Sequence, residues 1–254
     1  LAKQLLGRTY DVARPGVVAI YLTGSLPAGC GPHDVAIALV GKLFKSGYVK
    51  NKVMEFVGPG IASLRQDTRN AIDAMTTETT CLSSIWETDE KTRQFLTVHG
   101  RAGDYKPLHP AELAYYDGVV SVDLSKIRPM IALPMHPSNA FTIEELNANL
   151  EDILHACEQD VQKLIGRKDV QLDLCSKIEN GKLRVDQGVI AGCAGGLYDS
   201  IYEAASILKG HTGGCGDYAL SVYPGSQPIM MELVRTGVIG ELMASGATIR
   251  TAFC

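Results

Sequence analysis

The sequence has no long apolar run and no concentration of positive charge. None of its hydrophobic stretches approaches the roughly 20 residues that a membrane-spanning helix needs, and residues 1–5 lack the layout of a signal peptide. Lysine and arginine are scattered, and the formal net charge is -4. A membrane partner and a nucleic-acid partner are therefore both disfavoured, and we expect a cytoplasmic protein.

A disulfide framework is also missing. The chain has seven cysteines, an odd number, and they are widely spaced in a chain of 254 residues that can bury a core without covalent staples. Free thiols or metal ligands are the better interpretation. The seven are Cys30, Cys81, Cys157, Cys175, Cys193, Cys215 and Cys254.

Motifs for several common chemistries are absent as well. The glycine-rich stretch 213–216 is not followed by the lysine of a phosphate-binding loop, and no nucleophile elbow or complete Ser/His/Asp pattern is present. His211 and Cys215 flank a glycine loop without the four-ligand pattern of zinc, and a helix end explains that stretch. We expect surface or capping roles for the other histidines, namely His33, His99, His109, His136 and His155.

The chain does contain the alternation of an α/β protein, with 46% hydrophobic and 20% charged residues. Its first part predicts strands at 17–22, 53–57, 82–86 and 119–124, and helices at 34–44, 61–75 and 89–98. Its last part predicts strands at 189–191, 219–223 and 247–251, and helices at 197–209 and 228–235. Strands alternating with helices indicate mainly parallel, doubly wound sheets.

Between these parts, the proline-bearing stretch 129–137 is the best candidate for a domain boundary. Thr142 and Glu145 have the spacing of a capping box at the start of a helix. Apolar residues then recur at helical spacing up to Gly166, and Cys157 is one of them. We therefore expect Cys157 to be buried and to have no chemical role.

The stretch 189–196 is an apolar run that ends at a thiol and continues with residues that have almost no side chain. Cys193 and Cys254 each follow a predicted strand, and ligands bind where parallel strands end. The amino end of a helix favours a thiolate, and residues 194–196 leave room for a bulky group. A metal cluster is one interpretation; the other is that Cys193 is a small buried apolar residue beside a tight turn.

Glu78 lies in a threonine-rich run between a predicted helix and a predicted strand. There a carboxylate can point into a cleft as a base or an outer metal contact. A solvated loop acid is the equally open alternative.

In order and spacing, these motifs resemble the aconitase superfamily of iron–sulfur (de)hydratases over nearly the whole chain. The opening of that family's second domain is similar to residues 18–27, 31–36, 40–43 and 54–64, followed by the turn that contains Glu78. Its third domain is similar to residues 122–129, 204–210, 223–226 and 246–249. The resemblance implies two consecutive three-layer α/β/α domains, at 17–128 and 129–254, with 1–16 as the tail of a preceding domain and the third domain truncated at its carboxyl end.

The resemblance also implies a [4Fe-4S] cluster held by three cysteine thiolates. Its open iron acts as a Lewis acid when water is removed from, or added back to, a hydroxy di- or tricarboxylic acid. Cys193 and Cys254 match the first and second ligands, and the third would lie beyond the chain end. Glu78 matches an acid that acts on the hydroxyl or water at that iron. We expect a hydro-lyase that needs the remaining domains of the same parent chain, and an inactive fragment without a stable cluster.

The chain departs from aconitase at several polar positions. Thr and Asn follow the first cysteine in aconitase, whereas Ala194 and Gly195 follow it here, and an Asn four positions before the acid is replaced by Ala74. Because an altered set of hydrogen-bonding groups binds a different substrate, we expect a divergent hydratase rather than one specific for citrate and isocitrate. The alternative is a diverged, non-catalytic aconitase-like sensor or binding module.

Overall fold

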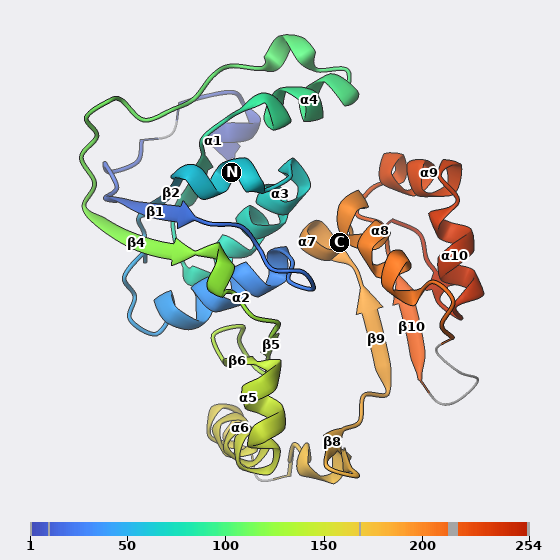
Figure 1. Ribbon diagram of the computed structural model, residues 1–254. Helices are drawn as coiled ribbons and strands as arrows, with labels where there is room; N and C mark the ends of the chain where they lie inside the picture. The colour runs from blue at the N-terminus through green and yellow to red at the C-terminus, as the bar shows by residue number, and fades with distance from the viewer. Residues whose placement is uncertain (1, 10, 168, 213–217, 253–254) are drawn as a thin grey trace.

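The computed structural model describes residues 2–9, 11–167, 169–212 and 218–252 (Figure 1). A short helix, α1 (Ala2–Leu5), precedes two parallel sheets, which are joined by a segment with a small core of its own. No helix in these ranges is both long enough and apolar enough to cross a membrane.

The first sheet is doubly wound. Its strands are β1 (Val17–Thr23), β2 (Val53–Val57), β3 (Ser83–Trp86) and β4 (Gly118–Asp123), in the order β3-β2-β1-β4, and every pairing is parallel. The chain moves outward from β1 to β3 and then returns to place β4 on the other side of β1. The carboxyl ends of β1 and β4 therefore form a topological switch point.

One face of this sheet carries the core of the N-terminal lobe (residues 17–127). Alternate residues of β1 point toward α2 (Pro32–Leu43) and α3 (Gln66–Met75), and Val18, Ile20 and Leu22 are fully buried there. The opposite face is flanked by the segment 110–116, and Tyr21 and Val119 remain 42% and 62% exposed on it. In the part of the chain that is described, this lobe is thus packed with helices mainly on one face.

One helix of this lobe begins differently from the sequence pattern, and another begins close to its predicted start. The helix expected at 61–75 is divided into a 3₁₀ helix, Pro59–Ser63, and α3, with Leu64 and Arg65 extended between them. Helix α4 (Glu90–Val98) begins one residue later than the predicted start at Asp89, which is its N-cap and whose side chain accepts the backbone N–H groups of Lys91 and Thr92.

In its described residues, the connecting segment 130–183 contains two hairpins, two α-helices and a 3₁₀ helix, Cys175–Lys177. Strands β5 (Met130–Ala132) and β6 (Ala140–Thr142) pair antiparallel, and so do β7 (Ile178–Glu179) and β8 (Lys182–Leu183). Helices α5 (Ile143–Ala148) and α6 (Leu150–Ile165) lie between the hairpins. The predicted capping box is confirmed, because the hydroxyl of Thr142 accepts the Glu145 N–H at 3.0 Å. Cys157 is buried, as predicted.

The C-terminal lobe (residues 187–252) contains the second parallel sheet. Its strands are β9 (Gln187–Ile190), β10 (Ala219–Val222) and β11 (Thr248–Ile249), in the order β11-β10-β9. The helices are α7 (Gly192–Gly195), α8 (Tyr198–Leu208), α9 (Gln227–Arg235) and α10 (Val238–Ala244). The sequence pattern missed α10, although Leu242 is fully buried with Leu233 and Val222. The chain crosses this sheet in one direction only, from β9 through β10 to β11. The domain limits at 16/17 and 128/129 stay a prediction.

Candidate functional site

Cys193 lies just past the carboxyl end of β9. Gly192, with a positive φ of 86°, turns the chain, and Cys193 then occupies the four-residue helix α7. The sequence predicted a thiol at the start of the long helix that follows. Instead, Leu197 is extended and separates α7 from α8.

The thiol of Cys193 is free and exposed. Among the described residues, no hydrogen bond to its sulfur is found. The alternative interpretation, a small buried apolar residue, is therefore wrong. An exposed thiol at the edge where parallel strands end is available to a ligand.

The two glycines that follow Cys193 have different surroundings. A Cβ at Gly196 would lie 2.7 Å from the carbonyl oxygen of Gly192 and 2.7 Å from the nitrogen of Gly225. Gly196 therefore lets two loops of the C-terminal lobe pack backbone against backbone, and it leaves no room for a ligand. A Cβ at Gly195 would meet only the imidazole of His33, at 3.7 Å.

His33 is a residue near the candidate site that the sequence analysis assigned to a surface or capping role. It lies in the first turn of α2 in the N-terminal lobe, yet it faces α7 of the C-terminal lobe. Burial lowers its pKa, and the nearby Asp34 only partly offsets this, so the imidazole is neutral near pH 7. Its position after β1, at the carboxyl edge of the first sheet, was the signal that could have identified it.

Cys254, the second predicted cluster ligand, lies outside the described residues, as does Cys215 of the glycine loop. Strand β11, which precedes Cys254 in the sequence, pairs with β10, and β10 pairs with β9. Cys193 and Cys254 thus follow strands of one sheet, as the sequence pattern predicted.

Glu78 lies in a 3₁₀ helix, Thr76–Thr79, that continues α3. Its carboxylate is 46% exposed, and its Oε2 atom is 3.7 Å from Nε2 of His136. The Nδ1 atom of His136 accepts the Ser138 N–H at 3.1 Å, so that the ring proton is on Nε2, toward Glu78. The ring of Phe44 stacks on His136 at 3.9 Å. His136 is a second residue that the sequence analysis had assigned to a surface role.

The threonines around Glu78 have a structural role. The hydroxyls of Thr76, Thr77 and Thr79 each donate to a backbone carbonyl three residues earlier, at 2.7, 3.1 and 2.6 Å. These bonds satisfy carbonyls where α3 ends. The threonine-rich run therefore holds Glu78 in place, and it is a helical extension rather than a polar loop.

The two lobes meet beside a cleft of about 550 Å³, lined by residues 25–32, by residues 63–65 and by α8. Arg65 crosses it, with Nε 3.1 Å from the carboxylate of Asp199 and with an ion pair to Glu203. Burial raises the pKa of Asp199. The charge of Arg65 lowers this pKa, whereas the neighbouring carboxylates of Asp67 and Glu203 raise it further. The charge of Arg65 is thus already matched by carboxylates.

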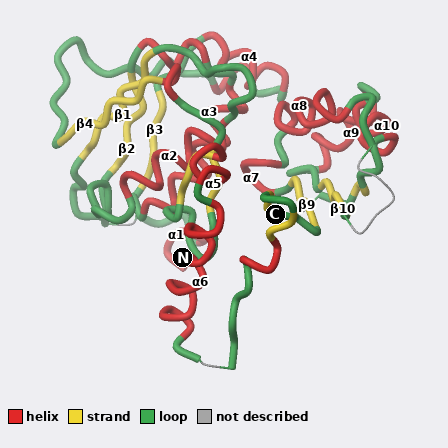
Figure 2. The backbone as a smooth tube through the Cα atoms, turned by 60° about the horizontal axis from the view of Figure 1, so that its bottom comes forward, coloured by secondary structure: helices red, strands yellow, loops and turns green. Residues whose placement is uncertain are grey.

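Helix α7 lies between the lobes and packs against α2 and α3 (Figure 2). Glu78 follows the end of α3, so α3 touches the Cys193 segment and also carries the predicted acid. Within the described residues, however, no hydrogen bond or ion pair joins Glu78 to Cys193. The structure brings together Glu78 with His136, and the Cys193 segment with His33.

Comparison with known proteins identifies several relatives. The chain spans about half the length of each of them. The 2,3-dimethylmalate dehydratase large subunit of Eubacterium barkeri is 28% identical over 240 residues, 94% of this chain and 49% of the relative. The 3-isopropylmalate dehydratase large subunits of Clostridium kluyveri and Thermoanaerobacter sp. are 26% and 30% identical, over 94% of this chain and 48% of each relative. Aconitase X of Thermococcus kodakaraensis, in its holo-form, superposes with a TM-score of 0.44 and 12% identity over 95% of this chain and 44% of that chain.

The relatives are dehydratase large subunits, which are hydro-lyases. The sequence model of the aconitase family (aconitate hydratase) matches residues 1–254, the whole chain. Because this match covers the whole chain, the chain belongs to the aconitase family.

Proposed function

We propose that this chain is part of a [4Fe-4S]-dependent hydro-lyase that dehydrates and rehydrates a hydroxy di- or tricarboxylic acid in the cytoplasm. The observation that carries the proposal is the free, exposed thiol of Cys193 at the carboxyl edge of a parallel sheet. That thiol stands where the family resemblance expects the first cluster ligand.

The described residues fit such a cluster. Cys193 is exposed, no hydrogen bond to its sulfur is found in the described part of the chain, and Gly195 presents no side chain beside it. Cysteine thiolates are the usual ligands of iron–sulfur clusters. Cys193, Cys254 and a further cysteine of the parent protein would hold the cluster, which when bound supplies a Lewis-acidic iron for removal of a hydroxyl group.

In this proposal Glu78 is the acid–base residue of this chain, and His136 positions it. The Nε2 atom of His136 lies 3.7 Å from Oε2 of the carboxylate, and the stacked Phe44 restrains the imidazole. The carboxylate remains accessible, and so it can exchange a proton with a substrate hydroxyl.

The names of the relatives support a hydroxy dicarboxylate as the substrate, since both substrates named there are substituted malates. They also support a small subunit as a partner, because the relatives are large subunits. The uncovered sheet faces agree with contacts to other domains or subunits. Tyr21 and Val119 are exposed on the first sheet, and Val189 is 55% exposed on the second.

The test is anaerobic reconstitution of the full-length parent protein with iron and sulfide. Optical absorption and electron paramagnetic resonance then report the cluster. We expect the parent to form it, Cys193→Ser to lose it, and Cys81→Ser, which removes another free thiol, to retain it. The chain of residues 1–254 alone should be inactive.

Turnover is then measured on 2,3-dimethylmalate, 3-isopropylmalate and citrate. We expect Glu78→Gln to retain the cluster and to lower kcat by about 10² to 10⁴, the usual contribution of a general acid or base. Absence of a cluster from the intact parent would contradict the proposal. A cluster without turnover would favour the alternative, a non-catalytic sensor or binding module, which the apolar replacements at Ala74, Ala194 and Gly195 also motivate.

A further inference from the structure

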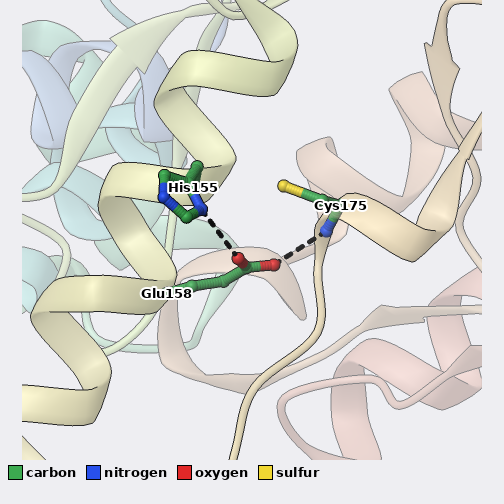
Figure 3. A group of neighbouring side chains, drawn as sticks. All are labelled: His155, Glu158 and Cys175. Carbon is green, nitrogen blue, oxygen red and sulfur yellow. Dashed lines mark hydrogen bonds and ion pairs between the residues drawn. The ribbon is translucent and has the colours of Figure 1, made fainter.

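Three side chains with different metal-binding atoms converge in the connecting segment (Figure 3). His155 and Glu158 lie three residues apart on one face of α6, and Cys175 begins a 3₁₀ helix, Cys175–Lys177, that packs against α6. One ligand atom from each lies within 4.8 Å of the other two. In Figure 1, α6 is below both sheets, away from α7, the helix that contains Cys193.

Glu158 is the fixed member of this group. Its Oε1 atom accepts the backbone N–H of Leu174 at 2.5 Å and that of Cys175 at 2.8 Å. The Cys175 N–H above all lowers the pKa of Glu158, and so the group is ionised near pH 7. Its other oxygen, Oε2, is 3.5 Å from Nδ1 of His155. Two backbone donors thus hold one carboxylate oxygen and leave the other facing the histidine.

The surroundings of Cys175 are acidic. Burial raises the pKa of its thiol, and the carboxylates of Glu158, Glu151 and Asp173 raise it further. A divalent cation reverses this effect, because its charge stabilises the thiolate and offsets the neighbouring carboxylates.

His155 has an outer partner that can set its tautomer. The side-chain amide of Gln159 lies 2.9 Å from Nε2 of His155. In the structure the amide nitrogen faces the ring and donates to Nε2, so Nδ1 carries the ring proton toward Glu158; a 180° flip of the amide moves the proton to Nε2 and leaves Nδ1 a lone pair for a metal. Metal-binding histidines are commonly oriented by such a hydrogen bond to the second ring nitrogen.

We propose that His155, Glu158 and Cys175 bind one divalent transition-metal ion of the zinc class. Nitrogen, oxygen and sulfur donors together suit Zn²⁺, and three protein ligands leave a fourth position for water. Ligand distances of about 2.0 to 2.3 Å place tetrahedral donors about 3.3 to 3.8 Å apart. Nδ1 of His155 and Oε2 of Glu158, 3.5 Å apart, already meet this separation, and the sulfur of Cys175, which lies within 4.8 Å, must approach by at most about 1 Å.

Metal binding links Cys175, which lies in the segment that leads to β9, to His155 and Glu158 of α6. The thiol of Cys175 loses its proton to solvent as the metal–sulfur bond forms. The site is independent of the proposed cluster, because it uses none of the residues assigned to that cluster.

The test is a Co²⁺ titration of the reduced full-length parent protein carrying Cys193→Ser, which removes the proposed cluster ligand. Co²⁺ reports thiolate binding through its charge-transfer absorption, and competition with Zn²⁺ yields the affinity. We expect one bound ion. Adding Cys175→Ser or His155→Gln should raise the Kd about 100-fold, and Gln159→Leu about 10-fold.

Matched controls use residues of the same kind elsewhere. Cys81→Ser and His99→Gln should leave the Kd unchanged. Glu158→Gln retains an oxygen for the two backbone donors, so a weaker Kd in this variant reports lost charge rather than an unfolded segment.

Circular dichroism without metal checks the fold, and His155→Gln, at a 63% exposed position, should not alter it. An unchanged Kd in Cys175→Ser, or a cobalt spectrum without thiolate absorption in the Cys193→Ser protein, would overturn the proposal. Either result would leave the cluster proposal intact.

Discussion

Arg69 is only 1% exposed, yet it carries a full charge. Its guanidinium forms an ion pair with Asp89 and donates to the carbonyl oxygens of Ile61 and Leu64, at 3.0 and 3.1 Å. Within the described residues, its Nε atom is buried without a partner. A buried cation of this kind depends on its carboxylate, because desolvating an unpaired charge is costly.

Asp89 supplies that carboxylate and also caps α4. Burial pushes its pKa up, but hydrogen bonds from Arg69, Thr92 and Lys91 outweigh it, and so the pKa lies below its usual range. An acid whose pKa is lowered by folding stabilises the folded state above its unfolded pKa. The stabilisation is lost as the pH falls from about 4 through the folded pKa.

We therefore predict that Asp89→Asn lowers the free energy of unfolding at pH 7 by about 2 to 4 kcal/mol. The estimate is reduced from that of a fully buried pair because Asp89 is 32% exposed. Denaturant titrations at pH 7 and pH 3 provide the measurement, and the difference between variant and parent should shrink at the lower pH. Glu90→Gln, which alters only an exposed pair with Arg93, is the control. Equal losses at both pH values would contradict the assigned role of the charge.

At the scale of elements, the division of the predicted helix 61–75 follows from the same arginine. The sequence pattern is helical across Leu64, but the chain is extended there, and the carbonyl of Leu64 accepts from Arg69 and Lys91. These side chains replace the hydrogen bonds that a continuous helix would make. Local periodicity could not reveal the break, because Lys91 comes from α4.

The loops that carry Cys193 provide a second element-scale prediction. We expect Gly196→Ala to lower the free energy of unfolding by about 1 to 3 kcal/mol, since its Cβ would press on two backbone segments. Gly195→Ala, with ordinary contact to His33 at 3.7 Å, should have little effect. Denaturant titration compares the two, and the rate of Cys193 alkylation reports whether α7 has shifted. Equal stability of both variants would show that the loops can separate without cost.

At the scale of the whole molecule, the guanidinium of Arg65 links the two lobes through ion pairs with acidic residues. Arg65 of the N-terminal lobe pairs with Asp199 and Glu203, and Oδ2 of Asp67 accepts the backbone N–H of Asp199 at 3.3 Å. Without Arg65, three carboxylates would face one another across the interface.

We predict that Arg65→Gln increases amide hydrogen exchange in α7 and at the start of α8. The stability of the protein should change by less than about 1 kcal/mol, because Arg65 is half exposed. Arg93→Gln, which breaks an exposed pair within α4, is the matched control. Unchanged exchange in α7 would mean that packing, rather than this ion pair, holds the lobes together.

The sequence by itself determined most strands and helices of the two lobes, the position of Cys193 after a strand, the burial of Cys157 and the capping box at Thr142. Each of these depends on local periodicity or on side chains a few residues apart. It also carried the family resemblance, because the ordered motifs extend over nearly the whole chain.

Only the tertiary structure decided which side chains meet. The pairing of Glu78 with His136, the approach of His33 to Gly195 and the group around Cys175 join residues that lie far apart in the sequence. Their contacts depend on how α2, α3, α6 and α7 pack, and a pattern with a period of 2 or 3.6 residues contains no information about such packing. The exposed thiol, the filled space at Gly196 and the metal-binding geometry on α6 are consequences of that packing.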